Sequence, residues 1–183
     1  MSKLYQVRLS GFGGQGIILA GIILGEAIAL YEDRHAIQSQ SYGPEARGGA
    51  SRAEVVISDE EIDLLEVTEP HLLLALSQLA YNKYSGNLHE DGIIIIDEDH
   101  VDTGATQKRI AALPISRIAR EEAGNPIVTN MVALGAVAAI TGIVGKETLK
   151  KAVAARAPAG TEELNLRAVD LGYDAGRELQ ATL

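Results

Sequence analysis

The chain has 183 residues, of which 46% are hydrophobic and 22% charged, a composition that suits one folded domain with a substantial core. Its formal net charge of −9 argues against a general nucleic-acid-binding protein. Cysteine is absent, which excludes disulfides and any zinc or iron–sulfur site with thiolate ligands on this chain.

The N-terminus passes directly from Met1 into a strand-like segment. It lacks the charged, apolar and small-residue order of a signal peptide, so we expect a cytoplasmic protein. The apolar segment Ile17–Leu30 is too short and too interrupted by glycine to cross a bilayer, so we expect no membrane span.

Strand patterns alternate with helical patterns along the chain. Tyr5–Ser10 and Arg52–Ser58 alternate apolar and polar residues, whereas Leu72–Leu76 and Ile93–Ile96 are continuously apolar, as in strands buried on both faces. Further strands are expected at Ala36–Ser41 and at Ile110–Ile115 (at an edge or end because of Pro114), and helices at Ile17–Leu30, Gln78–Tyr84, Ser116–Ala123, Ile127–Val144, Lys146–Ala155 and Thr161–Leu179.

This alternation predicts an α/β fold with a Rossmann-like, mostly parallel sheet and helices on both faces. No change in composition marks a second domain, so residues 1–183 are expected to form a single domain. The helices expected at Ile17–Leu30 and Ile127–Val144 are apolar on nearly every side and must be buried on every side. Either other helices of this chain or a partner subunit can provide that burial.

A glycine-rich turn, Gly-Phe-Gly-Gly-Gln-Gly at residues 11–16, joins the first strand to the first helix. A side chain at Gly11 would obstruct the tight turn, one at Gly13 would keep a phosphate from the backbone, and one at Gly16 would hold the helix off the strand. The helix N-terminus offers free N–H groups and a positive dipole end, and Gln15 adds an uncharged donor. The alternative is that these glycines only pack the helix against the sheet.

Binding of NAD through this turn would require an acidic residue at the end of the second strand, to hold the ribose hydroxyls. That strand ends Gln38-Ser39-Gln40-Ser41 without an acid, and Asp33 precedes it. The pattern therefore gives only weak support for a dinucleotide.

A second unusual loop, Ser-Tyr-Gly-Pro-Glu-Ala-Arg-Gly-Gly at residues 41–49, should lie at the carboxyl end of the second strand, beside the glycine-rich turn. Arg47 offers a planar fork of donors for carboxylate or phosphate, and Tyr42 can stack on a ring. The alternative is an ordinary turn in which Arg47 pairs with Glu45 or Asp59. The candidate ligand-binding residues are Gly11, Gly13, Gly14, Gln15, Gly16, Tyr42, Arg47, Gly48 and Gly49.

The two loops together, in this order and spacing, resemble the gamma subunits of 2-oxoacid:ferredoxin oxidoreductases, and the second is most like the 2-oxoglutarate branch. The segment Asn130–Gly135 also looks like this family, and the resemblance covers essentially the whole chain. It implies a single gamma-type domain in a complex that converts a 2-oxoacid and coenzyme A to acyl-CoA and carbon dioxide, with electrons passed to ferredoxin. It also implies alpha and beta subunits that bind thiamine diphosphate, and a ferredoxin-like subunit with iron–sulfur clusters.

The same resemblance implies that this subunit completes the assembly, binds no cofactor alone, and helps hold coenzyme A. Its residues offer no self-contained catalytic set: the four histidines lack metal-ligand spacing, Asp97-Glu98-Asp99 is typical of a solvated strand end, and Ser41 and Ser51 lack an assignable base. The isolated chain is therefore expected to be inactive. Two alternatives stay open: a free-standing NAD(P)-binding oxidoreductase, and a nucleotide- or coenzyme-A-binding module without chemistry.

Overall fold

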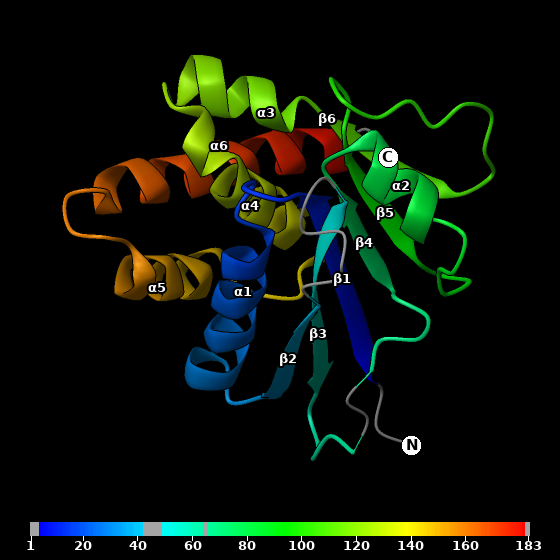
Figure 1. Ribbon diagram of the computed structural model, residues 1–183. Helices are drawn as coiled ribbons and strands as arrows, with labels where there is room; N and C mark the ends of the chain where they lie inside the picture. The colour runs from blue at the N-terminus through cyan, green and yellow to red at the C-terminus, as the bar shows by residue number, and fades with distance from the viewer. Residues whose placement is uncertain (1–3, 42–48, 64–65, 182–183) are drawn as a thin grey trace.

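The computed structural model describes residues 4–41, 49–63 and 66–181, which form a six-stranded sheet with helices packed against it (Figure 1). The strands are β1 (Tyr5–Phe12), β2 (His35–Ser41), β3 (Ala50–Ser58), β4 (Leu72–Ala75), β5 (Ile93–Asp97) and β6 (Arg109–Leu113). The helices are α1 (Ile17–Tyr31), α2 (Gln78–Tyr84), α3 (Ile115–Arg117), α4 (Thr129–Thr141), α5 (Lys146–Arg156) and α6 (Glu162–Gln180), with a π-helical turn η1 (Ile118–Glu122) and a 3₁₀ turn η2 (Pro126–Val128) between α3 and α4.

The strand order is β2-β3-β1-β4-β5-β6, and β1, β4, β5 and β6 run parallel. The expected mostly parallel sheet is thus confirmed, with β3 as the exception, because β3 pairs antiparallel with both β1 and β2. Only the eight residues 42–49 join β2 to β3, too few for the crossover that parallel neighbours require. The edge position expected for the strand near Pro114 is also confirmed, since β6 ends the sheet.

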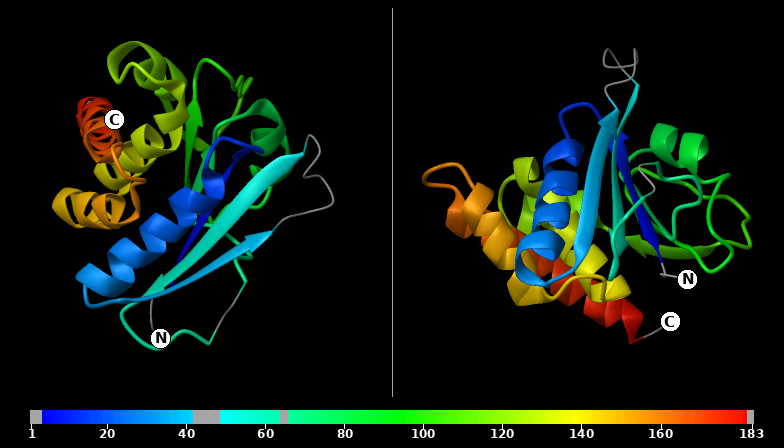
Figure 2. Two further views of the ribbon diagram at one scale, coloured as in Figure 1. Left: turned by 60° about the vertical axis from the view of Figure 1, so that its left-hand side comes forward. Right: turned by 90° about the horizontal axis from the view of Figure 1, so that it is seen from below.

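The two faces of the sheet carry different layers of helices, as predicted. Alternate residues of the central strands point to opposite faces, so that Leu72 and Leu74 pack in one apolar core and Leu73 and Ala75 in the other. Helices α1, α4, α5 and α6 cover the first face, whereas α2 covers the second (Figures 1 and 2).

Helix α4 is enclosed by this chain itself, because every residue from Thr129 to Ile140 is buried. Its backbone touches that of α6: a Cβ atom on Gly172 would lie 1.9 Å from the carbonyl oxygen of Val132, and one on Gly135 would lie 2.1 Å from that of Val169. For this helix, burial within the chain is therefore the correct alternative. Helix α1 is more open at its C-terminal end, where Leu30 and Tyr31 are exposed.

Several element boundaries differ from those expected. Helix α4 ends at Thr141 rather than Val144, because Gly142 takes a left-handed φ of 65° and caps the helix. Strand β1 continues to Phe12, so that the first two residues of the glycine-rich segment belong to the strand. Among the described residues no helix is long and apolar enough to cross a membrane.

Candidate functional site

The glycine-rich turn leaves the carboxyl end of β1, where Gly11 pairs with Ser51 and Phe12 with Ala50 of β3. The N–H of Gln15 donates to the carbonyl of Phe12 at 3.2 Å and closes the turn. The side chain of Gln15 folds back into it: Oε1 accepts the N–H of Phe12 at 2.6 Å, and Nε2 faces the carbonyl of Leu76 at 3.5 Å. Gln15 therefore closes the turn in this structure, whereas the sequence suggested a donor at its mouth.

The glycines of the turn meet different surroundings. A Cβ on Gly11 would lie 2.3 Å from Oε1 of Gln15, as expected for a position that a side chain would obstruct. Gly13 and Gly14 have open space on their Cβ side among the described residues, none of which, apart from the chain neighbours, has an atom within 4 Å, and Gly14 has a positive φ of 95°. No side chain in the described part of the chain therefore stands between a ligand and the backbone at Gly13 and Gly14.

Gly16 is required for a reason other than the one expected. It is the N-cap of α1 and has a left-handed φ of 70°. A Cβ there would lie 2.3 Å from Nδ2 of Asn130, whereas contact with the strand was predicted. Nδ2 of Asn130 donates to the Gly16 carbonyl oxygen at 3.2 Å, so the close neighbour of this glycine is α4.

The turn lies at a switch point of the sheet. The chain leaves β1 for α1 on one face, and leaves the adjacent strand β4 for α2 on the other face (Figure 1). Open α/β sheets bind ligands in the crevice outside the carboxyl ends of such strands. No described side chain caps the N-terminus of α1, which leaves its first N–H groups for a ligand.

The second predicted loop begins and ends at the same edge. Ser41, at the end of β2, pairs with Arg52, and Ala50 pairs with Phe12 at the end of β1. The predicted meeting of the two loops at one edge is thus confirmed for the residues that flank the second loop. Tyr42, Arg47 and Gly48 lie outside the described residues, and Gly49 is half-buried where the chain enters β3.

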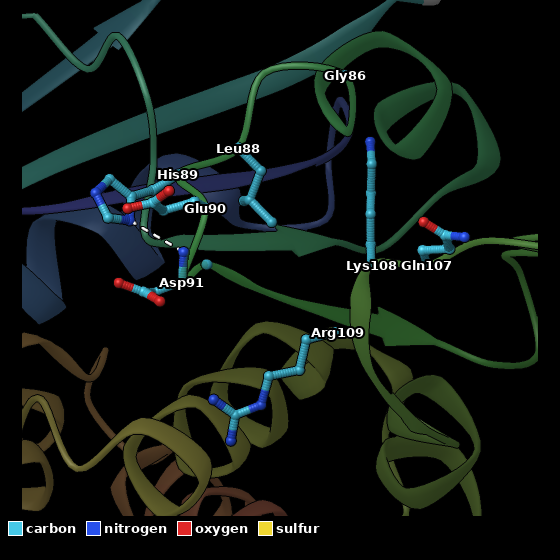
Figure 3. Close-up of a pocket in the computed structure, with 9 residues that line it drawn as sticks. Gly86, Leu88, His89, Glu90, Asp91, Gln107, Lys108 and Arg109 are labelled. Carbon is cyan, nitrogen blue, oxygen red and sulfur yellow. Dashed lines mark hydrogen bonds between the residues drawn. The ribbon is translucent and has the colours of Figure 1, made fainter.

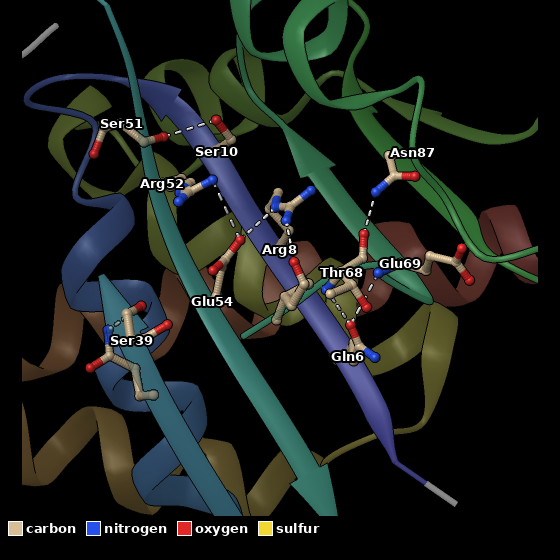
Figure 4. A network of polar contacts seen from close by, with 12 residues as sticks. Gln6, Arg8, Ser10, Ser39, Ser51, Arg52, Glu54, Thr68, Glu69 and Asn87 are labelled. Atoms are coloured by element: carbon tan, nitrogen blue, oxygen red, sulfur yellow. Dashed lines mark hydrogen bonds and ion pairs between the residues drawn. The ribbon is translucent and has the colours of Figure 1, made fainter. Parts of the chain in front are cut away.

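A buried polar network lies on the second face of β1 and β3 (Figure 4). Arg8 is 6% exposed; its Nε donates to Oε1 of Glu54 at 2.7 Å, its Nη2 donates to the carbonyl of Val67 at 2.7 Å, and it lies over the ring of Tyr84. Arg52 stands farther from the same carboxylate, at 3.8 Å, with its guanidinium partly exposed. Arg8 and Glu54 were not predicted as a buried pair. The signal that could reveal Arg8 is the alternation of the first strand, which puts the polar residues Gln6, Arg8 and Ser10 on one face.

A cavity of about 520 Å³ lies at the opposite edge of the sheet, beside the amino ends of β5 and β6. Its lining includes His89, Lys108 and Arg109, and the last two point to opposite sides of β6 (Figure 3). His89 stacks on His71 at 4.2 Å, and His71 in turn stacks on Tyr5. Burial raises the pKa of the Tyr5 hydroxyl, and the charge of Arg109 partly offsets this.

The acidic strand end around residue 97 is occupied by structural contacts. Asp97 is fully buried and accepts the backbone N–H groups of Asp99 and Ser116, whereas Glu98 and Asp99 both pair with Arg117. The described part of the chain holds no group of three or more histidine, aspartate or glutamate side chains that could hold a metal ion. These carboxylates therefore stabilise the carboxyl end of β5.

Comparison with known proteins identifies the family to which this chain belongs. Residues 6–175 match the family described as pyruvate ferredoxin/flavodoxin oxidoreductase. The chain belongs to this family. It is 53% identical over 177 residues to the 2-oxoglutarate synthase subunit KorC of Methanocaldococcus jannaschii, with 95% of each chain covered.

Solved structures agree with this assignment. The gamma subunit of a keto/oxoacid ferredoxin oxidoreductase from Geobacter sulfurreducens superposes with a TM-score of 0.88 at 45% identity, covering 97% of this chain and 98% of that one. A chain of the 2-oxoglutarate:ferredoxin oxidoreductase from Magnetococcus marinus shares the fold, with a TM-score of 0.80 at 23% identity, over 100% of this chain and 32% of that one. The predicted resemblance to gamma subunits, and to the 2-oxoglutarate branch, is thus confirmed: the chain is a gamma-type subunit of this oxidoreductase family.

Proposed function

We propose that this chain serves a complex that converts 2-oxoglutarate and coenzyme A to succinyl-CoA and carbon dioxide, passing two electrons to ferredoxin. The observation that carries this proposal is the similarity of the chain, over nearly its whole length, to a 2-oxoglutarate synthase subunit. Its own residues offer binding surfaces and backbone donors, and the described residues contain no assignable nucleophile–base pair. We therefore propose an assembly and binding role for the chain. We also propose that residues 1–183 form a single domain and that the protein is cytoplasmic.

The proposed partners are alpha and beta subunits that hold thiamine diphosphate, and a ferredoxin-like subunit that holds iron–sulfur clusters. The absence of cysteine supports this division, because thiolates are the usual cluster ligands and this chain has none to offer.

We further propose that the glycine-rich turn and the loop at residues 42–49 contact coenzyme A. The structural support is the open backbone at Gly13 and Gly14, together with the uncapped N-terminus of α1 at the switch point. The diphosphate of coenzyme A is the kind of anion that such a backbone site accepts. The Magnetococcus marinus enzyme is described with coenzyme A and succinyl-CoA bound. Gln15, Tyr42, Arg47, Gly48 and Gly49 stay proposed contacts of this ligand.

A free-standing NAD(P)-binding role has less support. In a dinucleotide-binding fold, the residue that holds the ribose lies at the end of the second strand, and that strand is parallel to the first strand and pairs with it. Here the strand that follows α1 is β2, and β2 is separated from β1 by β3, which runs antiparallel and carries Ala50, Ser51 and Arg52 at this edge. The acidic residue that NAD requires is missing there. A coenzyme-A-binding module without chemistry would show the same binding but would not assemble with redox subunits.

The variant Gly13→Val tests the coenzyme A contact. We expect a raised KM for coenzyme A in the reconstituted complex and a nearly unchanged melting temperature, because the added side chain enters open space where the ligand would approach. Gly86→Val is the matched control, since Gly86 also has open space but lies beside the cavity at the opposite edge. Equal KM values for the wild type and both variants would contradict the proposed contact.

A further inference from the structure

Asn130 is a buried polar residue that bridges α4 to the glycine-rich turn. It lies in the first turn of α4, is 4% exposed, and donates through Nδ2 to the carbonyl oxygen of Gly16, 114 residues earlier in the chain. The same oxygen accepts the N–H of Ala20 at 2.9 Å, the first hydrogen bond of α1. Two donors from different helices therefore fix one peptide group.

That peptide group determines where the turn points its donors. Gly16 has a left-handed backbone, and the peptide that carries its carbonyl also carries the N–H of Ile17, the first of α1. A rotation of this peptide would swing that N–H and change how the chain enters the helix. The contact with Asn130 opposes such a rotation, because Nδ2 already occupies the space beside the Gly16 Cα.

Helix α4, which carries Asn130, is firmly packed. Helix α4 is enclosed on every side, and its backbone touches that of α6 at Gly135 and Gly172. A binding group held by a packed helix is positioned more accurately than one held by a loop. Gln15 closes the near side of the turn and Asn130 the far side, while the backbone at Gly13 and Gly14 stays open.

We propose that Asn130 is a positioning residue for coenzyme A, which it orders through the Gly16 carbonyl without contacting the ligand. This inference rests on the proposed binding of coenzyme A by the turn. Asparagine suits the role because its amide donates a hydrogen bond and carries no charge. An aspartate at this position would place a carboxylate, which has no hydrogen to donate, against the Gly16 carbonyl oxygen. It would also place a negative charge near an anionic ligand.

The test uses the reconstituted complex with Asn130→Ala or Asn130→Asp in this chain. Asn165→Asp is the matched control, because Nδ2 of Asn165 also donates to a backbone carbonyl, that of Thr161 at 2.8 Å, at the start of α6. We expect the KM for coenzyme A to rise about three- to tenfold in Asn130→Ala, the equivalent of one neutral hydrogen bond, and further in Asn130→Asp. The kcat at saturating coenzyme A should be retained, and Asn165→Asp should match the wild type.

The outcomes separate this inference from the function on which it rests. A raised KM in Gly13→Val with an unchanged KM in both Asn130 variants would overturn the positioning role alone. An unchanged KM in all of these variants would overturn the coenzyme A contact and this inference with it. If Asn130→Asp fails to assemble, hydrogen exchange of the full-length chain carrying Asn130→Ala decides: selective acceleration at residues 13–18 supports the role, and exchange equal to that of the wild type overturns it.

Discussion

Arg8 is a buried charge whose polar groups are met by three partners. Its guanidinium donates to the Glu54 carboxylate and the Val67 carbonyl, and its face lies against the ring of Tyr84. Desolvating two charges is costly, and their mutual attraction offsets that cost only in such well-satisfied geometry. Removing one partner leaves the other buried and poorly compensated, because Arg52 reaches Glu54 only at 3.8 Å.

The variant Arg8→Ala should therefore lower the free energy of unfolding by about 3–5 kcal/mol. The control is Arg120→Ala, which breaks the pair between Arg120 and Glu121, both of which are more than half exposed. That change should cost about 1 kcal/mol or less. Urea unfolding of the three chains measures both effects, and losses of similar size in the two variants would refute the buried-pair account.

The local sequence pattern predicted the roles of some residues in the glycine-rich turn and missed those of others. The requirement for glycine at position 11 and the open backbone at Gly13 follow from the spacing within the turn, and both are present. The neighbour of Gly16 could not be predicted in this way. Asn130 is 114 residues away, and only the packing of α4 against α1 brings it to the turn.

Close contact between the backbones of α4 and α6 fixes the helical layer on the first face of the sheet. Glycine at positions 135 and 172 permits this contact, since a Cβ on Gly172 would lie 1.9 Å from the Val132 carbonyl oxygen. Backbone atoms cannot move aside as a flexible side chain can. An added methyl group must push the two helices apart and disturb the core between them.

We expect Gly172→Ala to lower the free energy of unfolding by about 1–3 kcal/mol, even though alanine favours helix more than glycine does. The control is Gly86→Ala, where the structure leaves open space and the substitution restricts only the unfolded chain. Its stability should equal or slightly exceed that of the wild type. The packing account fails if thermal melting shows Gly172→Ala to be as stable as Gly86→Ala.

An ion pair ties α1 to α5 and gives their contact a defined pH dependence. The hydrogen bond from Arg156 lowers the pKa of Glu26 from its ordinary value of 4.5; burial opposes this shift and the charge of Arg156 adds to it. Because the folded-state pKa is the lower one, the stabilisation is fully present above about pH 4.5 and is lost as pH falls through the folded-state value.

The difference in melting temperature between the wild type and Glu26→Gln should therefore be larger at pH 7 than at pH 3. The control is Gln78→Ala, which removes exposed neutral hydrogen bonds of Gln78 with the Asn82 side chain and the Asp102 backbone and should give a difference that does not change with pH. A difference for Glu26→Gln that is equal at both pH values would show that the pair does not stabilise the fold.

At the scale of elements, the hydrophobic patterns predicted all six strands and the bounds of α2, because apolar residues and turn residues alternate clearly. They did not predict the direction of β3, which depends on the short connection to β2 and on pairing with β1. They also extended α4 to Val144, since the apolar pattern continues past Gly142, whose left-handed backbone ends the helix.

For the molecule as a whole, the irregular features that carry the proposed function gather at the carboxyl edge of the sheet. The glycine-rich turn, the uncapped start of α1 and the entry to β3 all lie there. This edge was predictable from the sequence, because parallel strands with glycine-rich connections bind ligands at their carboxyl ends. It could not predict the cavity at the amino edge, which is formed by side chains from separate loops.

We propose that this chain acts only as the gamma subunit of a larger redox complex and has no activity of its own. The direct measurement is purification of the native complex through a tag on this chain, followed by assay of 2-oxoglutarate oxidation with coenzyme A and ferredoxin. We predict that subunits carrying thiamine diphosphate and iron–sulfur clusters co-purify, that activity depends on coenzyme A, and that the isolated chain gives none. Turnover by the isolated chain with added thiamine diphosphate and a dye acceptor, or its purification without redox subunits, would contradict the account.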